Sequence, residues 1–299
     1  MSNVYSKLDQ IPSGIAQGGL TPGCLVLEGG ALRTMYSQGV LDAWMQNGIN
    51  FQCVIGTSAG ALTGMNYMAR QIGSSARANL SSRFNSNFIG VNSLRKAHAL
   101  IRLDFLLKDY NQIELLNVRN FFDPERRFVA VVANCDTGER MYCDRDHCGN
   151  IMDAIKASAS MPFVTPMVNV DGIPGLDGGS CCKIPFQWAI EQGYEKIVIV
   201  KTREKEFRKT INDRRPAEKI YRNHQAFATA LDNSNEMYNL QCDAIDQLEA
   251  EGRVFVVCPQ KKVAVSRVER DIEKLGDLYW EGYEEGLAAI PRLREYLNR

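Results

Sequence analysis

The chain has 299 residues, and its 35 Lys and Arg balance 35 Asp and Glu, so the formal net charge is zero. This balance argues against nucleic acid as a partner, because binding to phosphate backbones needs an excess of basic side chains. A hydrophobic content of 45% with 23% charged residues is typical of a globular protein with a sizeable core. No apolar run reaches the ~18 residues that cross a membrane, and residues 1–19 lack the apolar segment of a secretory signal. We therefore expect a cytoplasmic protein.

Nine cysteines at irregular spacing indicate reduced thiols, and we expect the adjacent Cys181 and Cys182 to be free as well. One cluster contains residue types that bind zinc: Cys135, Cys143, His147 and Cys148. Its spacing is unlike that of a zinc ribbon or finger, and neither cysteine pair has the C-x-x-C form. We therefore predict hairpin thiols and no metal site.

In chain order, residues 1–23 form a polar lead-in, and a short buried strand is predicted from Cys24 to Leu27. A Gly-Gly turn then opens a helix that ends at Asn47-Gly48. A second apolar run, Phe51 to Ile55, leads through a Gly-rich turn into another helix. Strand, turn and helix, repeated once, predict a parallel sheet with crossover helices.

The remaining segments are assigned from the same patterns. Residues 74–112 are helix-prone, and Arg127–Cys135 with Glu139–Cys143 predict a hairpin. Further predictions are helices at 150–160 and 216–250, strands at 167–170, 197–200 and 254–257, and a closing amphipathic helix with Ile272, Leu275, Tyr279, Tyr283 and Leu287 in the core. We expect one domain over 24–299, with catalytic motifs in 24–200 and a helical part in 201–299.

From Lys201 onward the chain becomes rich in basic residues. Residues 201–222 contain nine Lys or Arg against four acidic residues. A solvated loop and helix start is the favoured interpretation, and a peripheral contact with anionic lipid head groups is the alternative.

The strongest local signal for chemistry is Gly56-x-Ser58-x-Gly60, placed between a predicted strand and a predicted helix. A serine nucleophile must stand on a sharp turn with its Oγ clear of the backbone. Glycines flank it because a Cβ there would clash where strand and helix approach. An ordinary Gly-rich turn is the alternative.

A second signal is Glu28-Gly29-Gly30-Ala31, which opens the first helix. Backbone N–H groups in such a turn converge on one point, and the helix dipole adds to their effect. The turn suits a phosphate or the oxyanion of a tetrahedral intermediate. It has neither the G-x-G-x-x-G pattern nor a Walker lysine.

A serine nucleophile also needs a base. The histidines are His98, His147 and His224. The order Ser58, Asp177, His224 would suit a Ser–His–Asp triad, but His224 lies in a charged, helix-like stretch. Asp177, in Leu176-Asp177-Gly178-Gly179, is the other candidate, because the glycines allow another turn to approach it closely.

Four blocks occur in the order found in patatin-like phospholipases, and the sequence resembles the bacterial branch of that family. They are Gly29–Arg33, Gly56–Gly60, Ala157–Pro162 and Asp177–Gly179. The resemblance implies a three-layer α/β/α fold with a mostly parallel central sheet, and a Ser–Asp dyad that hydrolyses acyl esters of lipids.

By position, the resemblance makes Ser58 the nucleophile and Asp177 the base, with no cofactor or metal required. It makes the N–H groups of Gly29, Gly30 and Ala31 the oxyanion donors, and Arg33 the basic substrate-binding residue beside them. Ala31 replaces the family's third glycine, and Thr34 replaces the glycine after the basic residue. With a negative φ, Ala31 would still donate its N–H.

The sequence therefore predicts a serine lipid acyl hydrolase that forms an acyl-enzyme. A non-catalytic protein that binds a lipid or another partner on the same fold is the rival from a different class. A triad esterase using His224 is the third candidate. The head group, the acyl chain and the oligomeric state are left open.

Overall fold

The structure, a computed structural model, describes residues 4–81, 115–211 and 217–299. Its central sheet is built from eight strands: β2 Thr21–Leu27, β3 Phe51–Thr57, β5 Arg127–Asn134, β6 Arg140–Asp144, β7 Val168–Val170, β8 Ile173–Asp177, β9 Ile197–Val200 and β10 Phe255–Val257. They follow the order β10-β9-β2-β3-β5-β8-β7, with β6 also paired to β5. Pairing is parallel from β10 to β5, whereas β6, β7 and β8 join antiparallel. A separate small sheet pairs β1 Gly14–Ile15 with β4 Gln71–Ile72.

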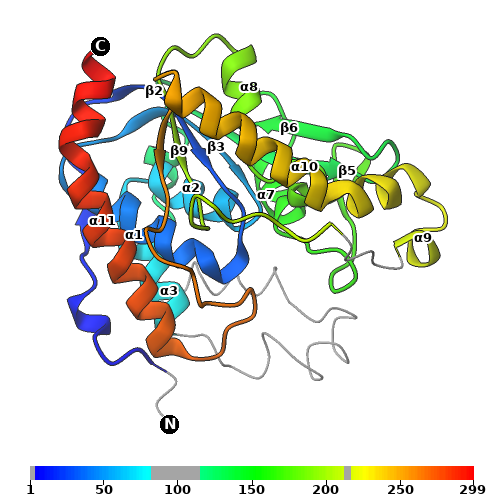
Figure 1. Cartoon of the computed structure of the whole chain (residues 1–299), viewed down its shortest axis with the longest axis horizontal. Coiled ribbons are helices and arrows are strands. Elements are labelled where there is room, and N and C mark those ends of the chain that lie inside the picture. Colours follow the sequence, from blue (N-terminus) through cyan, green and yellow to red (C-terminus); the bar gives the residue numbers. More distant parts are fainter. Residues whose placement is uncertain (1–3, 82–114, 212–216) are drawn as a thin grey trace.

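Helices cover both faces of this sheet (Figure 1). The α-helices are α1 Thr34–Gln46, α2 Ala59–Met68, α3 Ser74–Ser81, α6 Val118–Phe121, α7 Ile151–Ser158, α8 Phe186–Glu191, α9 Ala217–Ile220, α10 Gln225–Ala250 and α11 Ile272–Asn298. Short 3-10 helices occur at η1 Leu8–Gln10, η2 Ala31–Arg33 and η3 Gly178–Ser180.

The alternation of side chains along β2 explains the layers. Leu25 and Leu27 point into a core shared with α1, α2, α7 and α11. Cys24 and Val26 point into a second core, shared with α8 and α10. A strand buried on both faces reads as a continuous apolar run, which is the pattern found in the sequence. The predicted three-layer α/β/α fold with a mostly parallel sheet is confirmed.

The register on β5 brings two strand ends together. β6 pairs along one edge of β5, from Val129 to Ala133, so β3 and β8 must share the other edge. Thr57, the last residue of β3, pairs with Val131. Asp177, the last residue of β8, pairs with the next residue, Val132. The two strands run in opposite directions and therefore meet end to end beside β5.

Element bounds agree with the predicted ranges to within a few residues, but the lead-in is shorter than expected. β2 begins at Thr21, and the lead-in residues Tyr5 and Ile11 are buried in the core. Leu287 is 38% exposed, so its assignment to the core was wrong. Most of the helix-prone segment 74–112 lies outside the described residues, and its first part is α3.

The long helix predicted for 216–250 is divided into α9 and α10. Tyr221 lies in the break, with its side chain buried. Its hydroxyl accepts a hydrogen bond from the Phe163 N–H at 2.8 Å, and its ring packs edge-on against Phe227 with centroids 4.9 Å apart. These tertiary contacts outweigh the local helix propensity of the segment.

Basic side chains of the 201–222 stretch mostly have partners within the protein. Lys205 pairs with Glu249 at 2.5 Å, and Arg208 bridges two carboxylates of α10. Lys201 is buried, and Lys209 lines a pocket. Lys205, Lys219 and Arg222 are exposed, so part of the stretch is solvated as predicted. Contact with anionic lipid head groups stays a prediction, and residues 212–216 lie outside the described part.

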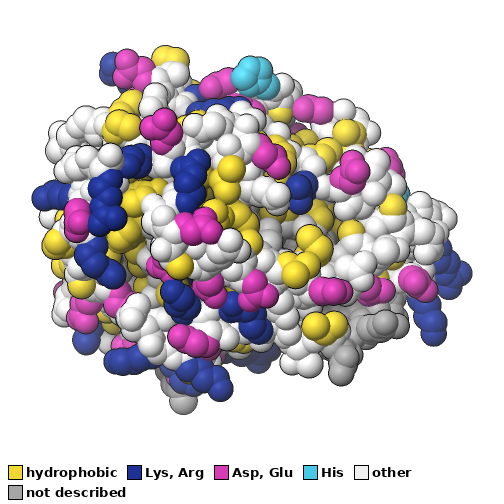
Figure 2. All heavy atoms as spheres, turned by 45° about the horizontal axis from the view of Figure 1, so that its top comes forward, with side chains coloured by type: hydrophobic (Ala, Val, Ile, Leu, Met, Phe, Trp, Pro, Cys, Tyr) yellow, Lys and Arg dark blue, Asp and Glu magenta, His cyan; other side chains and the backbone are white. Residues whose placement is uncertain are grey.

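The surface carries both signs of charge. Figure 2 shows Lys and Arg side chains interspersed with Asp and Glu over the face in view, with hydrophobic side chains between them. Among the described helices, none is both long and apolar enough to cross a membrane.

Candidate active site

Ser58 stands on the turn between β3 and α2 with φ 58° and ψ −129°, a strained conformation for a residue with a Cβ. The flanking glycines make this turn sterically feasible. A Cβ on Gly56 would lie 2.6 Å from the carbonyl of Gly60, and a Cβ on Gly60 would lie 2.7 Å from the carbonyl of Leu27. The strand and the helix therefore approach so closely that only glycine fits at Gly56 and Gly60, as predicted.

The Ser58 hydroxyl donates a hydrogen bond to Oδ2 of Asp177 at 2.7 Å. The other oxygen of that carboxylate, Oδ1, accepts from the N–H of Gly179 at 2.7 Å. Burial raises the pKa of Asp177, and the hydrogen bonds from Ser58 and Gly179 partly oppose that shift. A carboxylate with a raised pKa accepts a proton more readily than an exposed one.

The Ala157–Pro162 block supports both residues through the backbone. Ser158 Oγ accepts a hydrogen bond from the Ser58 N–H at 2.8 Å. The carbonyl of Ser160 accepts one from the Asp177 N–H, also at 2.8 Å. In the sequence this block is a family motif without an evident chemical role, because nothing in the motif shows which groups its side chains and backbone contact.

The loop before the first helix differs from expectation in two respects. The N–H of Gly29 donates to the carbonyl of Lys183 at 3.3 Å, so this donor is already engaged. Ala31 has φ 49°, so the condition under which it was expected to donate its N–H, a negative φ, is not met. Gly30 has no such strain, but a Cβ there would lie 2.6 Å from Oγ1 of the buried Thr202.

The left-handed conformation of Ala31 gives a stability prediction. Ala31→Gly should raise the free energy of unfolding by up to about 1 kcal/mol, because a Cβ at positive φ is unfavourable. Ala288→Gly, an exposed position within α11, is the matched control and should lower it by about 1 kcal/mol. Urea unfolding of both variants measures this. A similar destabilisation by both variants would contradict the prediction.

Ser58, Asp177, the loop and Arg33 meet in one pocket of about 350 Å³. Arg33 is buried and lies at the pocket wall. Other lining residues come from distant parts of the chain and include Met161, Pro162, Lys183, Lys209, Leu231 and Arg267. Lys183, Lys209 and Arg267 were not predicted as site residues, although Lys209 belongs to the basic stretch 201–222, because nothing in the sequence shows that these segments meet at one pocket.

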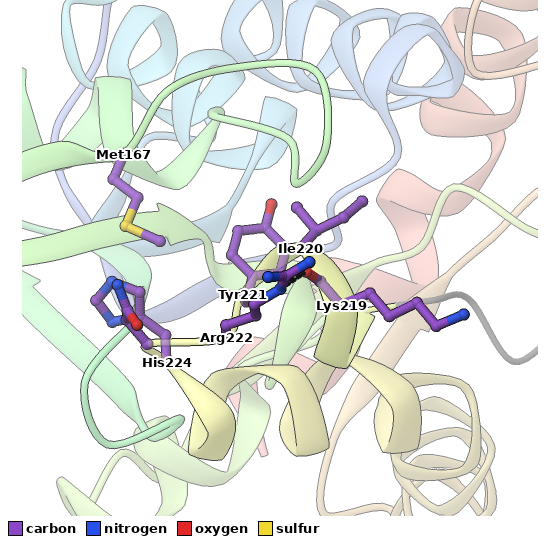
Figure 3. Close-up of a pocket in the computed structure, with 7 residues that line it drawn as sticks. Met167, Lys219, Ile220, Tyr221, Arg222 and His224 are labelled. Carbon is purple, nitrogen blue, oxygen red and sulfur yellow. Dashed lines mark hydrogen bonds between the residues drawn. The ribbon is translucent and has the colours of Figure 1, made fainter.

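His224 lies elsewhere. It lines a separate pocket with Met167 and Tyr221, and Figure 3 shows it beside Met167 there. Its Nδ1 lies 3.2 Å from Oδ1 of Asp136. The structure therefore does not bring His224 to Ser58, and the triad loses its geometric basis. His147 is exposed near Asp144, and His98 is outside the described residues.

All nine cysteines are free. Within the described ranges, which include Cys135, Cys143, His147 and Cys148, no group of three or more His, Cys, Asp or Glu side chains is arranged to hold a metal ion.

A serine on a strand-to-helix turn, hydrogen-bonded to a buried carboxylate, is typical of serine hydrolases. Residues 25–190 match the family model of patatin-like phospholipases, which covers more than half of the chain. The chain therefore belongs to the patatin-like phospholipase family, a family of lipid hydrolases. Residues 224–298 match a domain of unknown function, DUF6363.

Known proteins similar to this chain include YjjU and VipD. YjjU of Escherichia coli K12, described as uncharacterized, is 29% identical over 183 residues, which is 60% of this chain and 51% of YjjU. The chain thus aligns with about half the length of that relative. The crystal structure of VipD from Legionella pneumophila superposes with a TM-score of 0.46 at 12% identity, over 96% of this chain and 69% of VipD.

Proposed function

We propose that this protein hydrolyses acyl esters of lipids, with Ser58 as nucleophile and Asp177 as base. One observation carries the proposal: the Ser58 hydroxyl donates directly to a buried carboxylate, at 2.7 Å, inside a pocket. Membership of the patatin-like phospholipase family supports lipid esters as the substrate class.

In the proposed reaction, Ser58 Oγ attacks the ester carbonyl while its proton passes to Oδ2 of Asp177. The tetrahedral intermediate collapses, the alcohol leaves with that proton, and the acyl group stays on Ser58. Water that gives its proton to the same carboxylate then attacks the acyl-enzyme and releases the fatty acid. This scheme requires no metal or cofactor.

Three N–H groups of this loop were candidates for the oxyanion donors, and one of them already has a partner in the protein. Because the N–H of Gly29 is engaged by the carbonyl of Lys183, we assign stabilisation of the oxyanion to Gly30 first, and to Ala31 on the ground that it lines the same pocket as Ser58 despite its positive φ. Arg33, buried at the same wall of the pocket, faces the substrate.

Covalent labelling tests the proposal. A fluorophosphonate probe should modify Ser58, identified by peptide mapping, because only an activated serine reacts with it. Ser81, the serine at the end of α3 that hydrogen-bonds the carbonyl of Arg77, provides the control: Ser81→Ala should label as the unmodified protein does, and Ser58→Ala should not. A folded protein that takes no probe and hydrolyses no p-nitrophenyl ester or phospholipid would favour the non-catalytic binding protein.

A further inference from the structure

The pocket beside Ser58 contains more basic side chains than ester hydrolysis requires. Arg33, Lys183, Lys209 and Arg267 all line it, and they come from four separate segments of the chain. We call these four side chains the cationic wall. Three carboxylates also line the pocket: Glu28, Asp177 and Asp232.

Two of these carboxylates are already engaged. Glu28 accepts a hydrogen bond from the Thr202 N–H at 2.6 Å, and Asp177 is bonded to Ser58. In the described part of the chain, the side chains of Arg33, Lys183 and Lys209 have no carboxylate within ion-pairing distance. The positive charge of the wall is therefore only partly compensated within the protein.

Arg33 shows this most directly. It is 5% exposed and lies against the pocket, and its Nε has no hydrogen-bond partner among the described residues. A buried, unpaired charge-bearing group costs free energy unless a ligand satisfies it. Arginine in such a position suits an oxyanion, because its guanidinium presents several donors in one plane.

The two lysines show the same electrostatic conflict. Burial, with the neighbouring cations adding to it, lowers the pKa of Lys183 to about 8 and that of Lys209 to about 6. Arg267 contributes to both shifts, and Glu28 and Asp177 oppose them. Neighbouring cations in an enclosed site thus favour loss of a proton from the lysines, whereas an anion bound among them raises both pKa values and restores the positive charge.

We propose that the cationic wall binds a phosphate group on the substrate, so that the preferred substrates are acyl esters bearing an anionic phosphate. This inference rests on the proposed function. Four basic side chains from separate segments, all lining one pocket, suit a multiply charged anion such as phosphate better than a singly charged carboxylate. A zwitterionic choline head group would bring a further cation into the pocket, and a neutral ester would leave Arg33 Nε without a hydrogen-bond acceptor.

Lys209 is the residue best suited to a test. Its backbone N–H donates to Asn239 Oδ1 at 2.7 Å, and its carbonyl accepts from Asn239 Nδ2 at 2.9 Å. These bonds hold the main chain independently of the side chain, so Lys209→Met should leave the loop in place. Lys205, four residues earlier, pairs with Glu249 instead, and Lys205→Met is the matched control.

The experiment compares three substrates with identical acyl chains in neutral detergent micelles: phosphatidic acid, phosphatidylcholine and diacylglycerol. The unmodified protein should have its highest kcat/KM on phosphatidic acid. Lys209→Met should lower that value about tenfold or more and change diacylglycerol hydrolysis less than about twofold, because only the charged hydrogen bond to phosphate is lost. Lys205→Met should match the unmodified protein, and Lys209→Arg should retain the preference for phosphatidic acid.

Inhibition by inorganic phosphate distinguishes a wall that binds phosphate only as part of a lipid from one that also binds the free anion. If the wall recognises phosphate only as part of a lipid, millimolar phosphate should leave the hydrolysis of a neutral p-nitrophenyl ester unchanged. Competitive inhibition that weakens in Lys209→Met would show that the wall also accepts the free anion. Either result, together with the substrate preference, supports the proposal.

Equal loss on all three substrates in Lys209→Met, or an absence of preference in the unmodified protein, would overturn the phosphate proposal while ester hydrolysis itself still stands. Failure of the proposed function is distinguishable, because none of the three substrates would then be hydrolysed and Ser58 would take no probe. In that case, a rise in Tm with inorganic phosphate that is absent in Lys209→Met would still support an anion site. An unchanged Tm in the unmodified protein would contradict the anion site.

Discussion

Asp177→Asn should abolish nearly all ester hydrolysis, with a fall in kcat of about 10²–10⁴. Asparagine has almost the same shape, and its carbonyl oxygen can still accept from the Gly179 N–H, as Oδ1 of the carboxylate does. It cannot take a proton from Ser58, so the nucleophile stays un-ionised. Steady-state kinetics on a p-nitrophenyl ester measure the loss, and circular dichroism establishes that the variant is folded.

His224→Ala is the control for this result. Its side chain lies near Asp136, in a different pocket from Ser58 (Figure 3), so activity should stay within a few-fold of the unmodified protein. Substantial activity in Asp177→Asn would remove the carboxylate from the role of base. A loss of several orders of magnitude in a folded His224→Ala would return the triad to consideration.

Gly30→Val should lower kcat by about 10²–10³ and change KM little. A Cβ at Gly30 would lie 2.6 Å from Oγ1 and 3.2 Å from Cβ of Thr202. Thr202 cannot easily yield, because it is buried and its N–H is bonded to Glu28. The loop must therefore shift and move the N–H groups of Gly30 and Ala31 away from the oxyanion. Losing one such donor typically costs about 2.7–4 kcal/mol in the transition state, with little effect on substrate binding.

Gly19→Val provides the matched control, because a Cβ there meets nothing within 4 Å and the residue is exposed. Its kinetics should equal those of the unmodified protein. Melting temperatures of both variants separate a local displacement of the loop from a general loss of stability. Full activity in Gly30→Val would exclude this loop as the oxyanion site.

Most of the fold could be predicted because the central strands are buried on both faces. Continuous apolar runs such as Ile197–Val200 are visible in the sequence, and so is the glycine turn that follows the run from Cys24 to Leu27. The break before α10 was not predictable, because it depends on the contacts of Tyr221 with Phe163 and Phe227. Leu287 has helical spacing with buried residues but lies at the edge of the apolar face of α11, where it is 38% exposed.

The candidate site was predictable only where a motif names the residue type and its turn. Ser58 and Asp177 satisfy that condition, and their roles stay predictions until the experiments above are done. No such motif marks Lys183, Lys209 and Arg267 as site residues. Each comes from a different segment, and only the folded chain brings them to one pocket. The engagement of the Gly29 N–H by Lys183 is likewise a tertiary contact that no local pattern encodes.

The end-to-end meeting of β3 and β8 beside β5 has a consequence for the newly made chain. Ser58 and Asp177 are 119 residues apart, and their hydrogen bond depends on β8 having joined β5. Contacts of such large separation form late in folding, since closure of the intervening chain must precede them. A nascent chain that has emerged only as far as β5 therefore carries its serine without an acceptor for the proton. Under the proposed mechanism, the unfinished polypeptide therefore has no esterase activity until β8 has joined the sheet.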